Sequence, residues 1–499
     1  MWKWPKALRV RHINLWFALL FSLTGAIVIV IFAAWLLALQ LSVSTQRTSP
    51  TDLIRLALTI AAGVGGVVAL VVAYRRQRDL EQGRFVEAFG AAAKQLGDSD
   101  VAVRLAGVYA MAGVADQSSK LKQQQCIDVL CGYLRLPYSP ELGNNHQSAL
   151  VLRKAVLPKG GAEEELQFQY RQNDKVVRQT LVRVIVAHLQ QNAPHSWSSN
   201  NFDFSGAHFE ESEFEGATFS GDDTTFSGAT FSGGYTSFFQ VAFNGGFTMF
   251  DGAVFSSETT DFKDATFSGK TTMFNGVTFN SETTAFDEAV FSGKNTLFED
   301  ATFSGKNTSF SGATFRGKNI SFSGATFNGE ITRFWETSFE GETTRFWETS
   351  FKGETTLFDK AAFSGETTSF EKAAFSGETT SFEKAAFSGE TTSFSEATFC
   401  AEYTTFQGAA FSGKTTSFRD AAFSGEYHYF TGASFNSKYT SFLAARFGRA
   451  DSISFEDPLV WSPAPVFDWD DPTSDAAIPR PENVHPWDWP PSVRSEEAS

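Results

Sequence analysis

Phenylalanine recurs between residues 204 and 447 at a spacing that limits what this chain can fold into. From Phe219 the steps alternate between seven and five residues, so the 228 residues up to Phe447 hold 19 copies of a twelve-residue unit. A small residue stands two positions before nearly every phenylalanine, as Ala217 stands before Phe219. Residues two apart on an extended strand point to the same side, so each pair can face inward and stack on the next turn of chain. The stretch 200–449 is therefore predicted to be a β-solenoid.

An α-helix does not fit this stretch. Steps of five and seven residues do not keep to one face of a helix, and the recurring FSGETTSF is rich in Gly, Ser and Thr, which are weak helix formers. The first phenylalanines are spaced by five and have Ala207, Ser212 and Ala217 two positions before them. They are Phe204, Phe209, Phe214 and Phe219.

In these residues the chain resembles the pentapeptide-repeat family, whose consensus is a small residue, any residue and then Leu or Phe, every five residues. The resemblance implies a mainly β fold, a right-handed quadrilateral β-helix with four faces per coil. This chain departs from the consensus by two extra residues at every second corner. Each such corner carries a glycine two positions after Phe, as at Gly365, Gly377 and Gly389, where a turn is expected to need positive φ.

One coil is then expected to hold about 24 residues, or two repeats. The alternative is a flattened coil of twelve residues, but two phenylalanine rings facing each other would leave little width for its backbone. About ten coils at roughly 4.8 Å each would make a rod on the order of 50 Å long. The predicted core ladder includes Phe219, Phe231, Phe243, Phe255, Phe267, Phe279, Phe291, Phe303, Phe315 and Phe327.

The N-terminal region predicts two transmembrane helices. Basic residues 1–12 precede an almost uncharged run at 13–41, and a second apolar run covers 53–74; each is long enough for a bilayer core of roughly 20 residues. Arg75, Arg76 and Arg78 directly follow the second run, whereas the loop between the runs has only Arg47. Because basic residues stay on the cytoplasmic side, both termini and the repeats are expected inside the cell, behind a multi-pass anchor in the cell membrane.

Residues 77–192 read as a helical linker ending in a cap. Apolar residues recur at helical spacing in three short helices, with breaks at Gly97-Asp98 and at 116–119. The stretch GRFVEAFGAAAKQLGDSDVAVRLAGVYAMAGVADQ, continued by CIDVLCGYLRLPY, resembles the membrane-proximal region of membrane-anchored pentapeptide-repeat proteins of actinobacterial type. Residues 139–175 are expected to be rich in loops. The amphipathic stretch 176–191 is expected to form a helix that covers the first coil.

The tail, 450–499, is rich in Pro, Trp and Asp. Proline removes the donors that strand pairing needs, so the first part of the tail is expected to cover the last coil and the rest to be disordered. Trp461, Trp469, Trp487 and Trp489 could instead form a docking segment for a partner that reads aromatic residues, but covering the apolar end is the favoured interpretation.

No motif predicts catalysis or a cofactor. Residues Gly408 to Thr415 match the phosphate-loop pattern, but Phe411 is a step of the ladder, and the loop requires a helix after it. The seven histidines show no metal-ligand spacing, and Cys126, Cys131 and Cys400 form no pattern of pairs. A formal charge of −15 disfavours direct binding to nucleic acid. The chain is therefore predicted not to be an enzyme and to need no small-molecule substrate.

Two charged edges follow from the 24-residue coil. The acidic edge stacks Lys306 with seven glutamates that make a candidate surface for a basic protein partner, although a solvated column of corner residues explains them as well. These glutamates are Glu258, Glu282, Glu330, Glu354, Glu378, Glu402 and Glu426. The mixed edge stacks Lys270, Lys294, Lys318, Glu342, Glu366, Glu390, Lys414 and Lys438.

Three functions fit these features. The favoured one is a non-catalytic scaffold, held at the lipid bilayer by its two spans, whose rod binds an unidentified protein. The second is DNA mimicry directed at a type II topoisomerase or another basic protein, which some pentapeptide-repeat proteins perform. The third is an outward-facing adhesive or ice-binding rod, suggested by pairs such as Thr367-Thr368, which requires the opposite topology.

Overall fold

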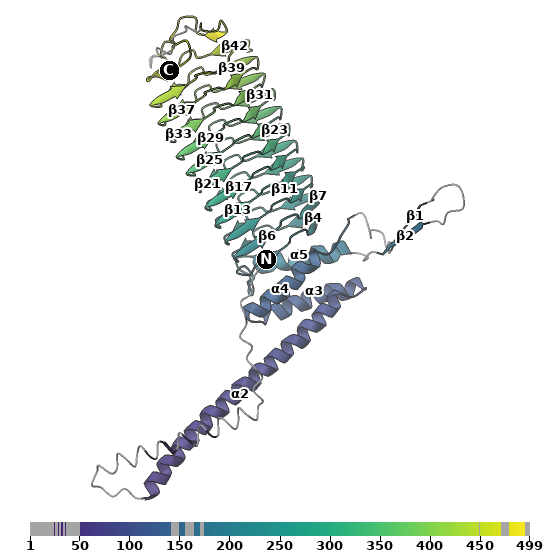
Figure 1. Cartoon of the computed structure of the whole chain (residues 1–499). Coiled ribbons are helices and arrows are strands. Elements are labelled where there is room, and N and C mark those ends of the chain that lie inside the picture. Colours follow the sequence, from purple (N-terminus) through teal and green to yellow (C-terminus); the bar gives the residue numbers. More distant parts are fainter. Residues whose placement is uncertain are drawn as a thin grey trace, which may run out of the picture. The chain divides into compact units, whose positions relative to one another are not determined.

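The computed structural model describes residues 24, 28, 31, 32, 35, 50–140, 149–154, 164–169, 174–448, 450–470 and 479–494 (Figure 1). The chain divides into two compact units, residues 1–90 and 91–499. The second unit holds a small helical region and a long stack of β-coils.

Helix α2 (Pro50–Leu96) contains the predicted span 53–74. It is the one helix among the described residues that is long and apolar enough to cross a membrane, with a mean hydropathy of 1.8 in a window that is not buried. The predicted span 13–41 lies outside the described residues. The apolar pattern at 85–96, expected as a separate short helix, continues α2 instead. Residues 75–96 contain no proline to interrupt it, and the helix ends before Gly97.

Three more helices follow: α3 (Val101–Asp116), α4 (Lys120–Leu134) and α5 (Asp174–Leu189). Both predicted breaks are confirmed, and the Asp100 carboxylate caps α3 by accepting from the Ala102 N–H at 2.8 Å. The stretch expected to be loop also contains an antiparallel hairpin of β1 (Ala149–Lys154) and β2 (Glu164–Gln169). The apolar run ALVL and the alternating LQF are strand signals, although charged residues surround them.

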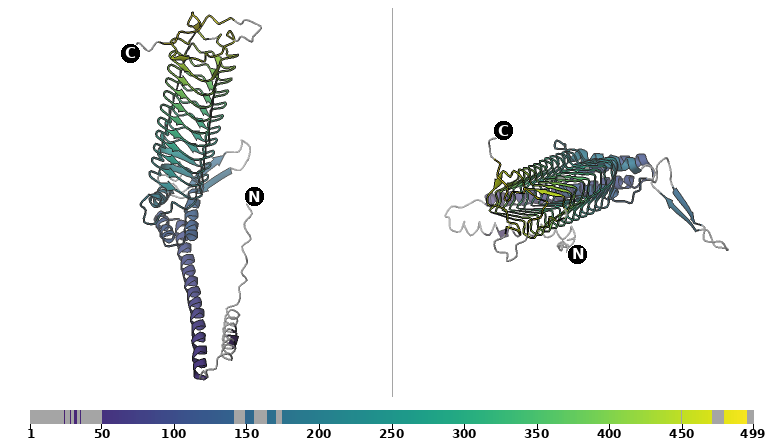
Figure 2. Two further views of the ribbon diagram at one scale, coloured as in Figure 1. Left: turned by 90° about the vertical axis from the view of Figure 1, so that its left-hand side faces the viewer. Right: turned by 90° about the horizontal axis from the view of Figure 1, so that it is seen from above.

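The repeats form a solenoid in which each coil has four short strands (Figures 1 and 2). Each strand pairs in parallel with the corresponding strand of the next coil. One coil runs through β10 (Val254–Phe255), β11 (Thr259–Asp261), β12 (Thr266–Phe267) and β13 (Thr271–Met273), and the next begins at β14 (Thr278–Phe279). Val254 pairs with Thr278 and Phe255 with Phe279, so the coil holds 24 residues, as predicted, and the twelve-residue alternative is wrong. The right-handed sense of winding stays a prediction.

The strands stack in four columns along the rod, and columns III and IV each contain 11 strands. Strands β4 (His208–Glu213) and β7 (Thr230–Ser237) run through both columns I and II. Column I continues with β10, β14, β18 (Thr302–Phe303), β22 (Thr326–Phe327), β26 (Ser350–Phe351), β30 (Ala374–Phe375), β34 (Thr398–Phe399) and β38 (Ala422–Phe423). Column II continues with β11, β15 (Thr283–Ala285), β19 (Asn307–Ser309), β23 (Ile331–Arg333), β27 (Thr355–Leu357), β31 (Thr379–Ser381), β35 (Tyr403–Thr405), β39 (Tyr427–Tyr429), β42 (Ser452–Ser454) and β44 (Val484–His485). Column III contains β5 (Thr218–Phe219), β8 (Ala242–Phe243), β12, β16 (Val290–Phe291), β20 (Thr314–Phe315), β24 (Ser338–Phe339), β28 (Ala362–Phe363), β32 (Ala386–Phe387), β36 (Ala410–Phe411), β40 (Ser434–Phe435) and β43 (Val460–Trp461). Column IV contains β3 (Phe202–Asp203), β6 (Asp223–Thr225), β9 (Phe247–Met249), β13, β17 (Asn295–Leu297), β21 (Asn319–Ser321), β25 (Thr343–Arg345), β29 (Thr367–Ser369), β33 (Thr391–Ser393), β37 (Thr415–Ser417) and β41 (Tyr439–Ser441).

Phenylalanine rings fill the inside of the solenoid. The rings of Phe262 and Phe286, one coil apart, stack with centroids 4.7 Å apart and planes 4° apart. Phe262 also meets Phe274 edge to face, at 5.9 Å and 88°. The residue two positions before nearly every ring is small and buried beside it. All ten phenylalanines of the predicted core ladder are completely buried.

Except for Gly233 (φ 99°), the corner glycines do not have the conformation expected of them. Positive φ occurs instead at the five-residue corners, at glycines such as Gly228 (φ 65°) and at side-chain-bearing residues such as Lys384 (φ 55°). Gly377, at a seven-residue corner, is required by close approach between coils, because a Cβ there would lie 1.8 Å from the carbonyl oxygen of Gly353. The extra two residues therefore bring the backbones of successive coils together rather than reverse the sign of φ.

The described part of the tail closes the far end of the solenoid. Strand β43 pairs with β40 and places the Trp461 ring edge-on to Phe435 at 5.4 Å. Trp469 stacks on Phe467 at 4.7 Å, and Trp489 meets the Phe467 ring at 5.2 Å. Residues 471–478 and 495–499, part of the tail expected to be disordered, lie outside the described residues.

Candidate functional site

The acidic edge lies at the seven-residue corners between columns I and II. Its side chains are all exposed, and backbone bonds link them coil to coil, as in Glu378 N–H to Glu354 carbonyl oxygen at 2.8 Å. Lys306 interrupts the glutamates and forms an ion pair with Glu282. That hydrogen-bonded contact raises the pKa of Lys306. The seven glutamates named from the sequence therefore form one row along the rod, with a single cation in it.

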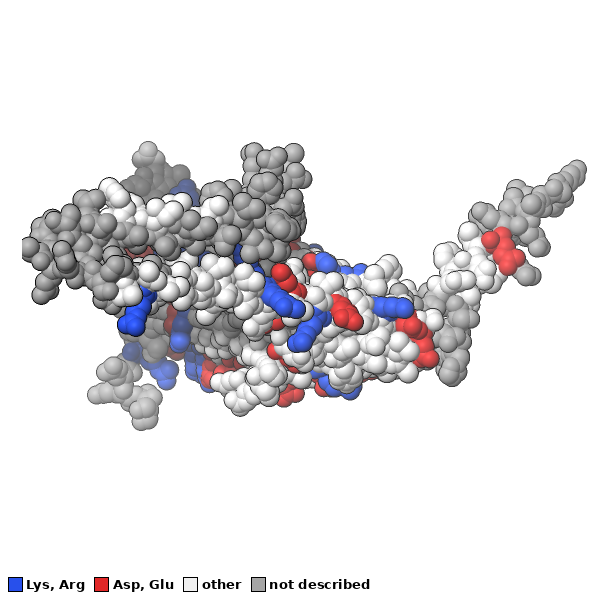
Figure 3. All heavy atoms as spheres, turned by 90° about the horizontal axis from the view of Figure 1, so that it is seen from below, with Lys and Arg blue, Asp and Glu red and all other residues white. Residues whose placement is uncertain are grey.

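The mixed edge lies at the corresponding corners between columns III and IV. Its eight residues are exposed and also carry one charge per coil. Lys318 pairs with Glu342 of the next coil at 2.9 Å, and Lys414 pairs with Glu390. Figure 3 shows one face of the molecule, on which Lys and Arg lie beside Asp and Glu.

Two tryptophans stand outside the ladder. Trp335 and Trp347 are 42% and 41% exposed and lie twelve residues apart, on opposite sides of the rod. The ammonium of Lys360 lies 5.1 Å from the centre of the Trp335 ring, and that of Lys372 lies 5.7 Å from the Trp347 ring. Each ring is thus covered in part by a cation from the next coil.

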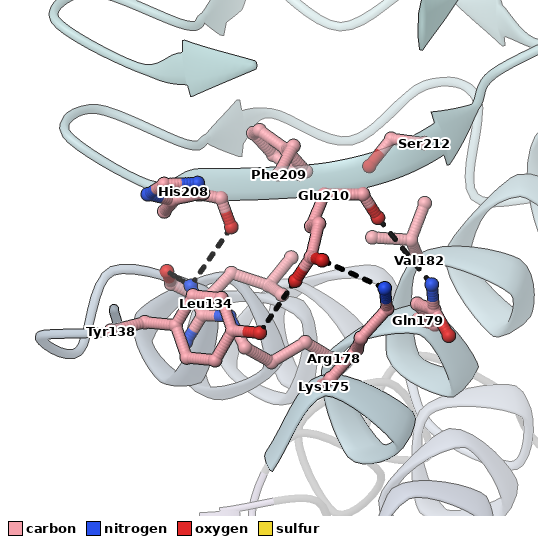
Figure 4. Close-up of a pocket in the computed structure, with 10 residues that line it drawn as sticks. All are labelled: Leu134, Tyr138, Lys175, Arg178, Gln179, Val182, His208, Phe209, Glu210 and Ser212. Carbon is pink, nitrogen blue, oxygen red and sulfur yellow. Dashed lines mark hydrogen bonds and ion pairs between the residues drawn. The ribbon is translucent and has the colours of Figure 1, made fainter. Parts of the chain in front are cut away.

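A polar cluster joins α5 to the first coils (Figure 4). The guanidinium of Arg178 donates to the carbonyl oxygens of Leu134 and of His208, the second at 3.2 Å. Glu210 accepts from the Lys175 ammonium at 2.7 Å and from the Tyr138 hydroxyl at 2.8 Å. These bonds satisfy backbone and side-chain groups at the solenoid edge that no preceding coil can reach.

Burial and charge shift the titration of this cluster. Burial, and then the hydrogen bond to Glu210, raise the pKa of Tyr138. Burial and the positive charge of Arg178 lower the pKa of His208. The remaining cavity has a volume of about 10 Å³, about what one water needs. The sequence signal of this cluster was Arg178, a charged residue among the apolar positions Val177 and Leu181.

The phosphate-loop match has no phosphate-loop structure. Its residues belong to β36, a corner and the start of β37, so no helix follows the glycine-rich turn. Phe411 is buried in the core, and the ammonium of Lys414 is held by Glu390. No group of three or more metal-ligating side chains occurs among the residues that the structure describes.

The repeat segment matches a known family of repeats. Residues 286–338 match the family model described as pentapeptide repeats (9 copies). The solenoid is built from pentapeptide repeats. The expected resemblance is thus confirmed for the repeats, although the matched segment includes the seven-residue corners that depart from the consensus. Searches of curated proteins and of solved structures found no match.

Proposed function

We propose that this pentapeptide-repeat protein is a membrane-anchored, non-catalytic scaffold. The observation that carries the proposal is the apolar stretch of α2, with side chains such as Leu58, Val67 and Leu70 more than 60% exposed, in one chain with a solenoid. A continuous stretch of exposed apolar side chains of this length is stable in a bilayer and not in water. Such an anchor resembles that of membrane-anchored pentapeptide-repeat proteins of actinobacterial type.

The proposed topology places the repeats in the cytoplasm. Residues 13–41 and 53–74 both span the cell membrane, and Arg75, Arg76 and Arg78 hold the end of the second span inside. Protease added to intact cells should leave the repeats intact, whereas protease added to inverted membrane vesicles should cleave them. Cleavage in intact cells would overturn both the topology and the cytoplasmic scaffold.

The proposed partner surface is the acidic edge. Seven exposed glutamates, one per coil of roughly 4.8 Å except where Lys306 interrupts them, produce a negative potential that attracts a basic protein. This attraction is stronger at low salt. The solenoid core is filled with buried phenylalanine rings, which pack against one another and carry no catalytic group. No cofactor or small-molecule substrate enters this proposal.

A capture experiment with the full chain in lipid nanodiscs tests this surface. The wild-type protein should retain a basic protein that elutes with salt, and the Glu330→Gln/Glu354→Gln/Glu378→Gln variant should lose it. The control is Glu371→Gln/Glu383→Gln/Glu396→Gln, which removes three carboxylates away from the acidic edge. Equal loss in both variants, or in neither, would refute a partner surface at this edge.

A second candidate, mimicry of DNA, is favoured by the same regular row of carboxylates. It predicts that the protein inhibits supercoil relaxation by a type II topoisomerase and that the acidic-edge variant does not. The third candidate, an outward-facing adhesive or ice-binding rod, requires repeats that protease reaches from outside the cell. The half-buried first residues of the column IV strands, such as Thr367 and Thr391, would then form its surface.

A further inference from the structure

The mixed edge has an order of charges that the acidic edge lacks. From Lys270 to Glu390, six successive coils carry three lysines and then three glutamates. Backbone bonds keep them in one row, as in Lys318 N–H to Lys294 carbonyl oxygen at 2.8 Å. The row therefore carries one charge per coil at a regular spacing of roughly 4.8 Å, and its two halves have opposite sign.

Such a row is complementary to itself when turned end for end. A second copy is generated by a 180° rotation about an axis that is perpendicular to the rod and passes between the coils of Lys318 and Glu342. Each of the three lysines of one copy then lies opposite a glutamate of the other. The opposed residues are Lys270 and Glu390, Lys294 and Glu366, and Lys318 and Glu342. Beyond them Lys438 faces Asp222 and Lys414 faces Gly246, so no like charges meet. We propose that two copies of this chain pair antiparallel along the mixed edge, about a two-fold axis between the coils of Lys318 and Glu342.

The charges inside each block are available for a second copy. Lys270, Lys294 and Glu366 are exposed and form no ion pair with another residue of the described part of the chain. Pairs within the chain occur where the blocks change sign, at Lys318–Glu342 and Glu390–Lys414. Like charges stacked one coil apart repel each other in a single rod, and an opposite block from a second copy removes that repulsion.

The residues beside the edge permit close approach. On one side the first residues of the column IV strands are small and uncharged across the centre, namely Thr271, Asn295, Asn319, Thr343, Thr367 and Thr391. On the other side Arg316 and Glu340, which pair at 2.9 Å, change sign between the same two coils as the edge does. The flank therefore has the same self-complementary order about the same axis.

The sign order also excludes other arrangements of this kind. Two acidic edges would place glutamate against glutamate at nearly every coil. Two mixed edges in parallel register would place lysine on lysine. A parallel pair shifted by three coils would leave one block of each copy unpaired and would grow into filaments rather than close. Among pairings of two like edges, charge order thus selects both the edge and the direction.

Variants that reverse the charges of the mixed edge test the pairing. They are made in the full chain, with one copy in each nanodisc. Two copies should associate at low salt and separate at high salt, measured by sedimentation. Lys270→Glu/Lys294→Glu/Lys318→Glu and Glu342→Lys/Glu366→Lys/Glu390→Lys should each weaken self-association by at least roughly tenfold. Mixing the two variants should restore a one-to-one pair, and this rescue also shows that both are folded.

A matched variant and a crosslink complete the test. Glu330→Lys/Glu354→Lys/Glu378→Lys makes the same change of charge on the acidic edge and should leave the pairing intact. With Cys400→Ser as background, Lys270→Cys should form a disulfide with Glu390→Cys of another copy and not with Glu342→Cys. A wild-type protein that stays monomeric at low salt, a dimer that survives either triple variant, failure of mixing to restore it, or the reverse crosslink pattern would overturn the proposal.

Discussion

His428 occupies a core position that suits a threonine, and its replacement should change how stability depends on pH. In column II, His428 pairs with Thr404 of the coil before it and with Ile453 of the strand after it. Its side chain is completely buried, neither ring nitrogen has a hydrogen-bond partner, and its ring meets Phe423 edge-on at 5.2 Å. Burial lowers the pKa of His428 from 6.5 to about 4.

The direction of the effect follows from proton linkage. Between the two pKa values the unfolded chain binds a proton that the folded chain does not, so the free energy of unfolding falls as the pH falls from about 7.5. At about pH 5, the difference between the two pKa values lowers the free energy of unfolding by about 2 kcal/mol relative to about pH 7.5. This loss comes from the His428 side chain alone. The His428→Thr variant should lack that loss.

Because a solenoid unfolds in part from its ends, the assay should be local. Hydrogen exchange of β35, β39 and β42 at about pH 7.5 and pH 5, corrected for the intrinsic exchange rate, gives the opening free energy of these strands. We expect wild type to lose about 2 kcal/mol more than His428→Thr over that range. The control, His195→Thr, replaces an exposed histidine and should behave as wild type. Equal pH dependence in wild type and His428→Thr would refute the burial argument.

Five further substitutions, in three tests, probe the packing, and their costs are measured as opening free energies of the neighbouring strands by hydrogen exchange. Phe334→Ala should cost about 3–5 kcal/mol because it empties a closed stack, whereas Trp335→Ala, beside it and exposed, should cost less than about 1.5 kcal/mol; equal costs would contradict the ring core. Gly377→Ala should destabilise because its Cβ meets a carbonyl oxygen, whereas Lys384→Gly should stabilise by about 0.5–1 kcal/mol by relieving a positive φ; the opposite order would show that the corners have other roles. Arg178→Met should cost about 3 kcal/mol and expose β4 to hydrogen exchange, and unchanged protection of β4 would rule out its part in the cap.

The interior of the solenoid could be predicted from the sequence because the phenylalanines recur at a regular period. A ring every five or seven residues with a small residue two positions before it leaves one strand geometry in which all rings point inward. The same regularity gave the 24-residue coil and therefore the two charged edges, whose members are adjacent only after two repeats have been wound.

The corners and the cap were less readable, because their conformations depend on neighbours far away in sequence. A corner can require glycine either because φ is positive or because two backbones approach closely. At Gly377 the reason is close approach, and it follows only from the position of Gly353 in the preceding coil. Likewise, Arg178 looked like an interruption of an apolar helix face until His208 and Leu134 supplied carbonyl oxygens for its guanidinium.

By itself, the sequence determined that the repeats wind into a ring-filled coil, since local spacing alone states which side chains share a face. The tertiary structure decided which corners adopt positive φ, how the solenoid edge is capped, and which charges of the described residues remain unpaired on each edge. Those outcomes depend on distances between separate coils, and such distances exist only once the backbone has stacked.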